Sequence, residues 1–165
     1  MTPSTRAVGS VAAADSAPKS GRILAIDYGR RRIGLAISDE LGLTAQPLPT
    51  IQRKNRRADL HRLRDVVQKK GARAVLVGSP VHLSGRQSEM ASEAARFARR
   101  VQEELGLPVE LRDERLTSWE AEQMAAEMGL EKNADLDSLA AAILLREYLD
   151  ETRSRRRSKR PVQAS

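Results

Sequence analysis

The sequence predicts one α/β domain: a mixed five-stranded sheet, three antiparallel strands followed by parallel strands, with helices packed on it. Two observations predict this fold class. Near the start of the chain a short turn separates two apolar runs, and further on apolar runs alternate with segments of helical periodicity. The length of 165 residues fits a single domain with a substantial core.

The first three strands are expected to be antiparallel. Residues 22–27 form a continuous apolar run, as in a central strand that is covered on both faces. The turn at residues 28–32 is short, so the next run, residues 33–38, should pair with it as a hairpin. A third strand near residues 42–51 contains Pro47 and Pro49, which predicts an edge position.

The middle of the chain alternates between helix and strand. Apolar residues at helical spacing predict a helix over 57–70, with Leu60, Leu63, Val66 and Val67 facing the core and Gly71 ending it. A buried strand over 73–78, a helix over 88–105 and a short strand over 109–112 should follow.

Two more helices are predicted near the end. Residues 117–120 read Thr-Ser-Trp-Glu, a capping box that starts a helix ending at Gly129. The last helix should begin near Asp135, the natural N-cap. Its expected buried residues are Leu136, Leu139, Ala140, Ile143 and Leu144.

Both ends of the chain differ in composition from the domain, which we place at residues 21–152. Residues 1–20 are rich in Ala, Ser, Pro and Gly, which predicts a disordered tail and not a signal peptide. Residues 153–165 carry six basic and no acidic residues and are also expected to be disordered. This basic tail is either a nucleic-acid-binding arm or a solvated segment.

Composition excludes several classes of function. No long apolar run could span a membrane. The chain has no cysteine and two histidines, which excludes a disulfide scaffold, a thiol nucleophile and a cysteine or histidine-rich metal centre. One Trp, two Tyr and one Phe are too few for a base-stacking platform. Any bound metal must therefore be held by carboxylates.

The net charge of +7 is unevenly distributed along the chain. Residues 22–90 have 14 basic and 6 acidic residues, whereas residues 91–152 have 7 basic and 15 acidic residues. The basic half could follow a phosphate backbone while the acidic half supplies metal ligands. Two solvated helix faces of opposite sign would give the same pattern.

Three carboxylates are candidates for such a metal site. Asp27 ends the first strand, where ligands gather in open α/β sheets, although a turn aspartate bound to its own backbone is an alternative. Glu114 ends the last strand out of phase with the core residue Leu111, unlike Asp113. Asp137 shares one helical stripe with Ala140, so it should face inward, although an acid in a first turn also suits the helix dipole. Together they could hold two Mg²⁺ or Mn²⁺ ions.

Four motifs follow one another along the chain: D-Y-G-R-R-R-I-G-L-A-I-S-D from Asp27, G-x-P at Gly78 to Pro80 with Gly85 after it, D-E-R-L-T-S from Asp113 and D-x-D-S-L-A-A from Asp135. These motifs, in this order, resemble those of the YqgF family. This bacterial family has an RNase H-like fold, is related to Holliday junction resolvases and is described as pre-16S rRNA nucleases. The resemblance covers about residues 21–149. One departure is Ser79, where the family usually has leucine.

The resemblance implies a cytoplasmic, metal-dependent nuclease that processes the 5′ end of precursor 16S rRNA in ribosome biogenesis. The family's acidic site falls on Asp27, Glu114 and Asp137, with Mg²⁺ or Mn²⁺ as the expected cofactor. Nearby arginines are expected to position the scissile phosphate unless they are solvated surface residues: Arg30, Arg31, Arg32 and Arg115. Gly78, Pro80 and Gly85 are expected to form a substrate loop.

Other functions stay open at this point. A junction resolvase would cut structured DNA, normally as a dimer, but the sequence does not choose between monomer and homodimer. A non-catalytic module that binds RNA or protein would explain the charges equally well. Asp-x-Gly before a hairpin also opens sugar kinases and actin-like ATPases, but these need two such domains, and this chain has length for one.

Overall fold

The computed structural model describes residues 21–80, 89–114 and 136–159, and the single positions 123, 126, 127 and 129. Its elements are β1 (Arg22–Tyr28), β2 (Arg32–Ser38), β3 (Ala45–Gln52), α1 (Arg56–Lys70), β4 (Ala72–Pro80), α2 (Glu89–Leu105), β5 (Val109–Glu114) and α4 (Leu136–Ser158). All five predicted strands are present, and the sheet is mixed, as expected. The capping box at residues 117–120 and the tail at residues 1–20 lie outside the described residues.

The strands form one sheet in the order β3-β2-β1-β4-β5. β1, β2 and β3 are antiparallel neighbours, which confirms the hairpin and places the proline-containing strand at an edge. β4 pairs in parallel with β1, and β5 pairs in parallel with β4. The carboxyl ends of β1, β4 and β5 therefore meet at one end of the sheet.

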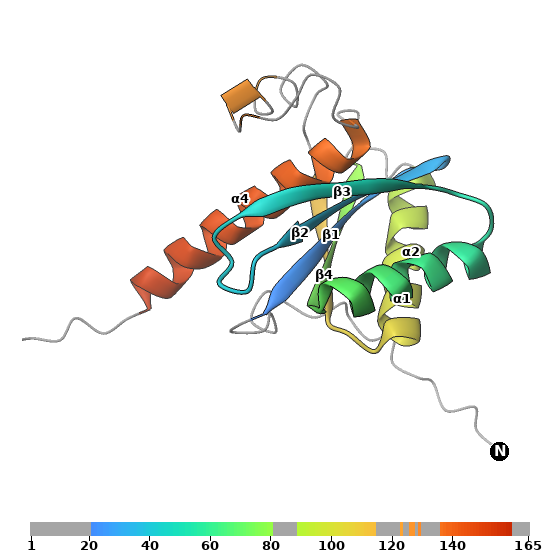
Figure 1. Ribbon diagram of the computed structural model, residues 1–165, viewed down its shortest axis with the longest axis horizontal. Helices are drawn as coiled ribbons and strands as arrows, with labels where there is room; N and C mark the ends of the chain where they lie inside the picture. Colours follow the sequence, from blue (N-terminus) through green and yellow to red (C-terminus); the bar gives the residue numbers. More distant parts are fainter. Residues whose placement is uncertain are drawn as a thin grey trace, which may run out of the picture.

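Helices cover both faces of the sheet (Figure 1). Along β1, Leu24 and Ile26 pack in the core under α1 and α2, whereas Ile23 and Ala25 pack in the core under α4. This alternation is the period of two that strand geometry imposes. Burial on both faces explains why the strand is apolar throughout.

The ends of α1 follow from local sequence. Asn55 is the N-cap, and its side chain accepts a hydrogen bond from the Ala58 N–H at 2.9 Å. Gly71 ends the helix with φ 69°, a left-handed conformation that favours glycine. The predicted stop at Gly71 is therefore confirmed.

Two expectations about α4 were wrong. Leu136 is 55% exposed, because it is the first residue of the helix and precedes the turn that contacts the sheet. The helix also continues to Ser158, so residues 153–158 are helical and not disordered. Basic residues occupy its last turn, where they complement the helix dipole. The rest of the predicted tail lies outside the described residues.

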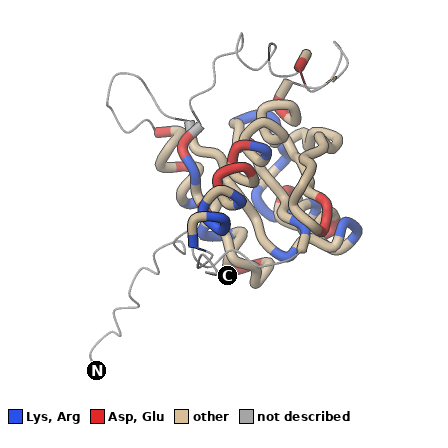
Figure 2. Tube along the Cα trace, turned by 90° about the vertical axis from the view of Figure 1, so that its left-hand side faces the viewer, with Lys and Arg blue, Asp and Glu red and all other residues tan. Residues whose placement is uncertain are grey.

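Charge is mixed in space, although it is divided along the chain. Blue and red stretches alternate over the visible side of the tube in Figure 2.

Among the described residues, none of the helices has the length and apolar character of a membrane span.

The turn between β2 and β3 is held by Asp39. Its Oδ1 accepts hydrogen bonds from the backbone N–H groups of Leu43 at 2.7 Å and Thr44 at 2.9 Å. The bond from Thr44 is the main cause that lowers the pKa of Asp39.

We expect Asp39→Ala to lower the free energy of unfolding by about 1 kcal/mol at neutral pH, through loss of these bonds. Because the pKa is lower in the folded state, the stabilisation is complete above the unfolded pKa of about 3.9 and is lost as the pH falls through the folded value. Urea unfolding of both proteins at neutral pH and at about pH 3 measures this. A difference that does not shrink in acid would contradict it.

Candidate active site

Asp27 lies at the carboxyl end of β1, between glycines of the two neighbouring strands. Its Cα is in register with Gly34 of β2 and Gly78 of β4. It shares the alternation of Ile23 and Ala25, so it lies on the face of the sheet that α4 covers. β1 continues to Tyr28, so Asp27 is part of the strand. Its side chain is partly exposed beside two positions that have no side chain of their own.

Asp137 reaches the same place from the first turn of α4. A Cβ on Gly34 would lie 2.0 Å from the backbone oxygen of Asp137, so the helix rests directly on the strand there. Because Gly34 is also the register partner of Asp27, the two aspartates are neighbours across one glycine. The structure thus places the backbones of two acidic residues, far apart in the sequence, on either side of Gly34.

Ser138 anchors this contact, and the sequence had not singled it out. The sheet register shifts between Ile33 and Leu35, and there the Leu35 N–H donates to Ser138 Oγ at 3.2 Å. Ser138 Oγ also hydrogen-bonds Thr50 Oγ1 of β3 at 2.8 Å. Ser138 is 1% exposed. One buried hydroxyl therefore joins the start of α4 to β2 and β3, and it fixes the neighbouring Asp137.

Glu114 is the last residue of β5, at the same end of the sheet. Its Cα is in register with Pro80 of β4. Leu111 packs in the core under α1 and α2. Asp113 shares the alternation of Leu111, as the sequence predicts, but it is exposed because it lies at the end of the strand. Glu114 is two residues after Arg112 in β5, so both positions belong to the same face of the sheet. Arg112 forms an ion pair with Glu151 of α4. The side chain of Glu114 lies outside the described part.

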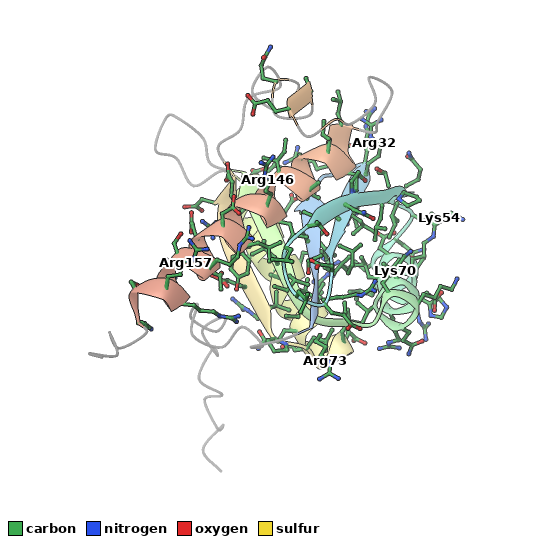
Figure 3. The ribbon with its side chains drawn as sticks, turned by 60° about the vertical axis from the view of Figure 1, so that its left-hand side comes forward. Arg32, Lys54, Lys70, Arg73, Arg146 and Arg157 are labelled. Carbon is green, nitrogen blue, oxygen red and sulfur yellow. The ribbon has the colours of Figure 1, made fainter. Side chains whose placement is uncertain are left out.

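The arginines of the β1–β2 turn have separate partners. Arg32 Nε lies 3.0 Å from Asp137 Oδ2, and Figure 3 shows Arg32 near the start of α4. Arg30 extends to the other face, where it pairs with Glu89 at 3.6 Å and Glu93 at 3.7 Å. Arg31 is exposed in the turn. The predicted Arg115 lies outside the described residues.

Of the predicted substrate loop, the structure describes the beginning. Gly78 and Pro80 belong to β4, and Gly78 is the other register partner of Asp27. Ser79, at the position where the family usually has leucine, is 4% exposed. Gly85 lies outside the described residues. The strand part of the loop therefore borders Asp27.

A partly buried network on the opposite face supports the turn, and the sequence had not indicated it. Arg53 donates to the Gly29 carbonyl at 3.1 Å, to the Tyr28 hydroxyl at 3.0 Å and to Asp59 at 3.2 Å. Burial acts to lower the pKa of Arg53, but its bonds to Tyr28 and Asp59 outweigh burial and raise that pKa. A permanently charged guanidinium therefore ties the turn after Asp27 to the start of α1.

The donor chemistry of this end of the sheet suits a hard divalent cation. Asp27 and Asp137 supply carboxylate oxygens, the ligands that Mg²⁺ and Mn²⁺ prefer. Among the side chains that the structure describes, no group of three His, Cys, Asp or Glu gathers as a complete metal cluster. The third candidate, Glu114, is not among those side chains. Two of the three expected ligands, Asp27 and Asp137, therefore lie on either side of Gly34.

The fold is that of RNase H-like nucleases of the resolvase class. It is similar to the RuvC resolvase of Thermus thermophilus in complex with a Holliday junction, with a TM-score of 0.55 and 19% identity over 80% of this chain and 96% of that chain. The resolvase of fowlpox virus with its Holliday junction DNA is also similar, with a TM-score of 0.50 and 14% identity over 79% and 98%. At these identities the likeness concerns the fold.

The chain belongs to the RuvX family, also called YqgF, whose model is described as Holliday junction resolvase and matches residues 21–151. A relative from Koribacter versatilis is 46% identical over 79% of this chain and 87% of its own length. Another relative, from Geobacillus kaustophilus, is 42% identical over 80% of this chain and 99% of its own length. Both are named, as a provisional assignment, pre-16S rRNA nuclease. This confirms the predicted family and supports a nuclease.

Proposed function

We propose that the protein is a metal-dependent nuclease that hydrolyses phosphodiester bonds at the 5′ end of precursor 16S rRNA. The observation that carries this proposal is the packing of the start of α4, at Asp137, on Gly34, which is the register partner of Asp27 at the carboxyl end of β1. Two carboxylates on one rigid sheet and helix can be held close without a flexible loop. If Asp27 and Asp137 were only solvated surface charges, the close packing of α4 on Gly34 would not be needed to position them.

Each residue of the site has a separate part in this proposal. Asp27, Asp137 and Glu114 would hold Mg²⁺ or Mn²⁺. When bound, a pair of such ions supplies an activated water and stabilises the leaving oxygen of the phosphodiester. Arg32 orients the Asp137 carboxylate at 3.0 Å, and its side chain is 56% exposed, so it can also contact a phosphate.

The substrate follows from the family. Relatives are named for precursor 16S rRNA, so we assign RNA of the assembling ribosome as the substrate and the cytoplasm as its place of action. Cleavage of junction DNA is the second candidate, favoured by the description of the family model. That activity would call for a homodimer, whereas RNA cleavage could be performed by a monomer.

Cleavage of a labelled precursor 16S rRNA 5′ fragment tests the proposal. We expect the wild type to cut it with Mn²⁺ or Mg²⁺ and not with EDTA. Asp27→Asn should reduce the rate by about a thousandfold or more, because an amide is a poor ligand for a hard cation and metal catalysis contributes several kcal/mol. A four-way DNA junction, assayed in parallel, separates the two substrates.

Asp113→Asn is the matched control. Asp113 is an exposed carboxylate that directly precedes Glu114 at the end of β5, so in strand geometry the two residues lie on opposite faces of the sheet. We expect it to cleave like the wild type. If Asp27→Asn also cleaves like the wild type, the site is misplaced. If no variant cleaves but all of them bind RNA, the protein is a non-catalytic RNA-binding module.

A further inference from the structure

A second feature of this chain suits a nucleic acid, and it lies on the face of the sheet opposite Asp27. We propose that a pocket between α1 and α2 binds a phosphate group of the RNA at a distance from the acidic site. This inference rests on the proposed function for its substrate, but not on its metal or its chemistry. The pocket is defined by four arginines, Arg53, Arg56, Arg96 and Arg100, together with Tyr28, Phe97 and Glu93.

The floor of the pocket is rigid. Tyr28 and Phe97 are each 8% exposed, and their ring centroids lie 4.8 Å apart. The Arg53 guanidinium lies 4.9 Å from the centre of the Tyr28 ring and pairs with Asp59, whose side chain is 2% exposed. Arg53 is thus held in place by aromatic and ionic contacts where it lines the pocket, and Asp59 offsets its charge.

The walls of the pocket carry charge that the described residues do not neutralise. Within the described part of the chain, Arg56, Arg96 and Arg100 form no ion pair. The pocket's one acid, Glu93, pairs with Arg30 at 3.7 Å. Arg53 is neutralised by Asp59. Three guanidinium groups from two helices therefore line a space whose one carboxylate, Glu93, is already paired with Arg30, and this excess of positive charge suits a phosphate.

The position of the pocket connects it to the acidic site. Tyr28 follows Asp27 in β1 and so lies on the opposite face. The turn between β1 and β2 joins the two places, since Arg30 contacts Glu93 of the pocket and Arg32 contacts Asp137. An RNA strand that crosses this turn would pass Arg30, Arg31 and Arg32. The pocket would therefore hold a phosphate other than the one at the bond that is cut.

The surrounding surface favours RNA over an acidic protein. α1 adds further cations on the same side, and Figure 3 shows Lys54 and Lys70 there, away from Arg146 and Arg157 of α4. Arginine matches the geometry of phosphate oxygens with paired N–H donors. Arginines around one pocket, with lysines on the same side of the molecule, suit the backbone of a nucleic acid.

RNA binding by three single variants of α2 tests this inference. Arg96→Gln and Arg100→Gln remove charges that line the pocket, and Arg99→Gln removes an equal charge from an exposed residue of the same helix outside it. Affinity for a fluorescent single-stranded RNA is measured by anisotropy in EDTA at several salt concentrations, so that no cleavage interferes. Unchanged melting temperatures establish that each variant is folded.

We expect Arg96→Gln and Arg100→Gln each to weaken binding by about tenfold and to reduce the slope of log affinity against log salt by about 0.7, the value for one lost phosphate contact on a single strand. Arg99→Gln should change both quantities much less. Equal effects of all three variants would mean a diffuse basic surface and would overturn the pocket. The pocket would also be overturned if inorganic phosphate displaced RNA equally well from the wild type and from Arg100→Gln.

Two RNAs distinguish the source of the phosphate. If the loss on Arg100→Gln needs a 5′-phosphate, the pocket binds a strand end, and if a 5′-hydroxyl RNA shows the same loss, it binds an internal phosphodiester. Either result supports the pocket. The pocket and the proposed function can fail independently. If Arg96→Gln and Arg100→Gln weaken RNA binding but the wild type shows no metal-dependent cleavage, the pocket is supported and the nuclease function is contradicted.

Discussion

Gly34→Ala should lower the free energy of unfolding by about 3 kcal/mol, the largest stability effect that we expect from a single methyl group in this protein. The added Cβ would lie 2.0 Å from the backbone oxygen of Asp137 and 2.8 Å from the Ser138 nitrogen. These are backbone atoms, so no side chain can rotate away. The start of α4 must move off β2, which breaks the bonds of Ser138 to Leu35 and Thr50.

The same change should reduce RNA cleavage by about a hundredfold or more even where the protein stays folded, because displacing a site residue by about 1 Å can cost this much. Denaturant unfolding and the cleavage assay measure the two effects. Gly106→Ala is the control: it has φ 65° and open space around it, so it should cost about 1 kcal/mol and leave cleavage intact. Equal behaviour of the two variants would show that α4 does not need to touch β2.

Asp137→Asn should reduce the rate of metal-dependent cleavage by about a thousandfold with little change in stability. The amide keeps the shape of the side chain but loses the charge that would bind a divalent cation, and metal catalysis is worth several kcal/mol. The ion pair with Arg32 is partly exposed, at 32% and 56% for the two side chains, so its loss costs at most about 1 kcal/mol.

Arg32→Gln distinguishes two roles of Asp137, that of a metal ligand and that of the ion-pair partner of Arg32. This variant removes the ion pair but keeps the Asp137 carboxylate. We expect it to raise KM through the lost phosphate contact while kcat falls by less than about tenfold. Rates over a series of Mn²⁺ concentrations with saturating RNA provide the comparison. If Asp137→Asn and Arg32→Gln lower kcat alike, Asp137 acts by holding Arg32 and not as a ligand.

Local patterns were enough to predict most of the elements. The apolar run before Asp27 and the short turn after it predicted the β1–β2 hairpin, and Gly71 marked the end of α1. Errors came where local signals were weak. Residues 153–158 lack apolar side chains but are helical, because they extend a helix whose earlier turns are buried on the sheet. The exposed Leu136 shows that an apolar residue at a helix start need not reach the core.

For the site, the sequence and its family resemblance predicted the acids, and the structure places Asp27 beside Asp137. Gly34 had been noted only as part of a motif, yet its missing side chain makes this contact possible. Ser138 and Thr50 carried no pattern of their own, since their bond joins residues 88 positions apart. The arginine pocket was also beyond reach, because Arg53, Arg56, Arg96 and Arg100 come from a loop and two helices.

The sequence by itself determined the fold class and most of the strand and helix segments, and it predicted carboxylates as the ligands of any metal. These properties depend on residue type and on spacing within one element, which are legible along the chain. Only the tertiary structure decided which charges meet: Asp137 with Arg32, Arg30 with Glu93, and four arginines around one pocket. The reason is physical, because contacts between distant segments depend on strand register and on how closely a helix can approach a sheet, and here one glycine sets that approach.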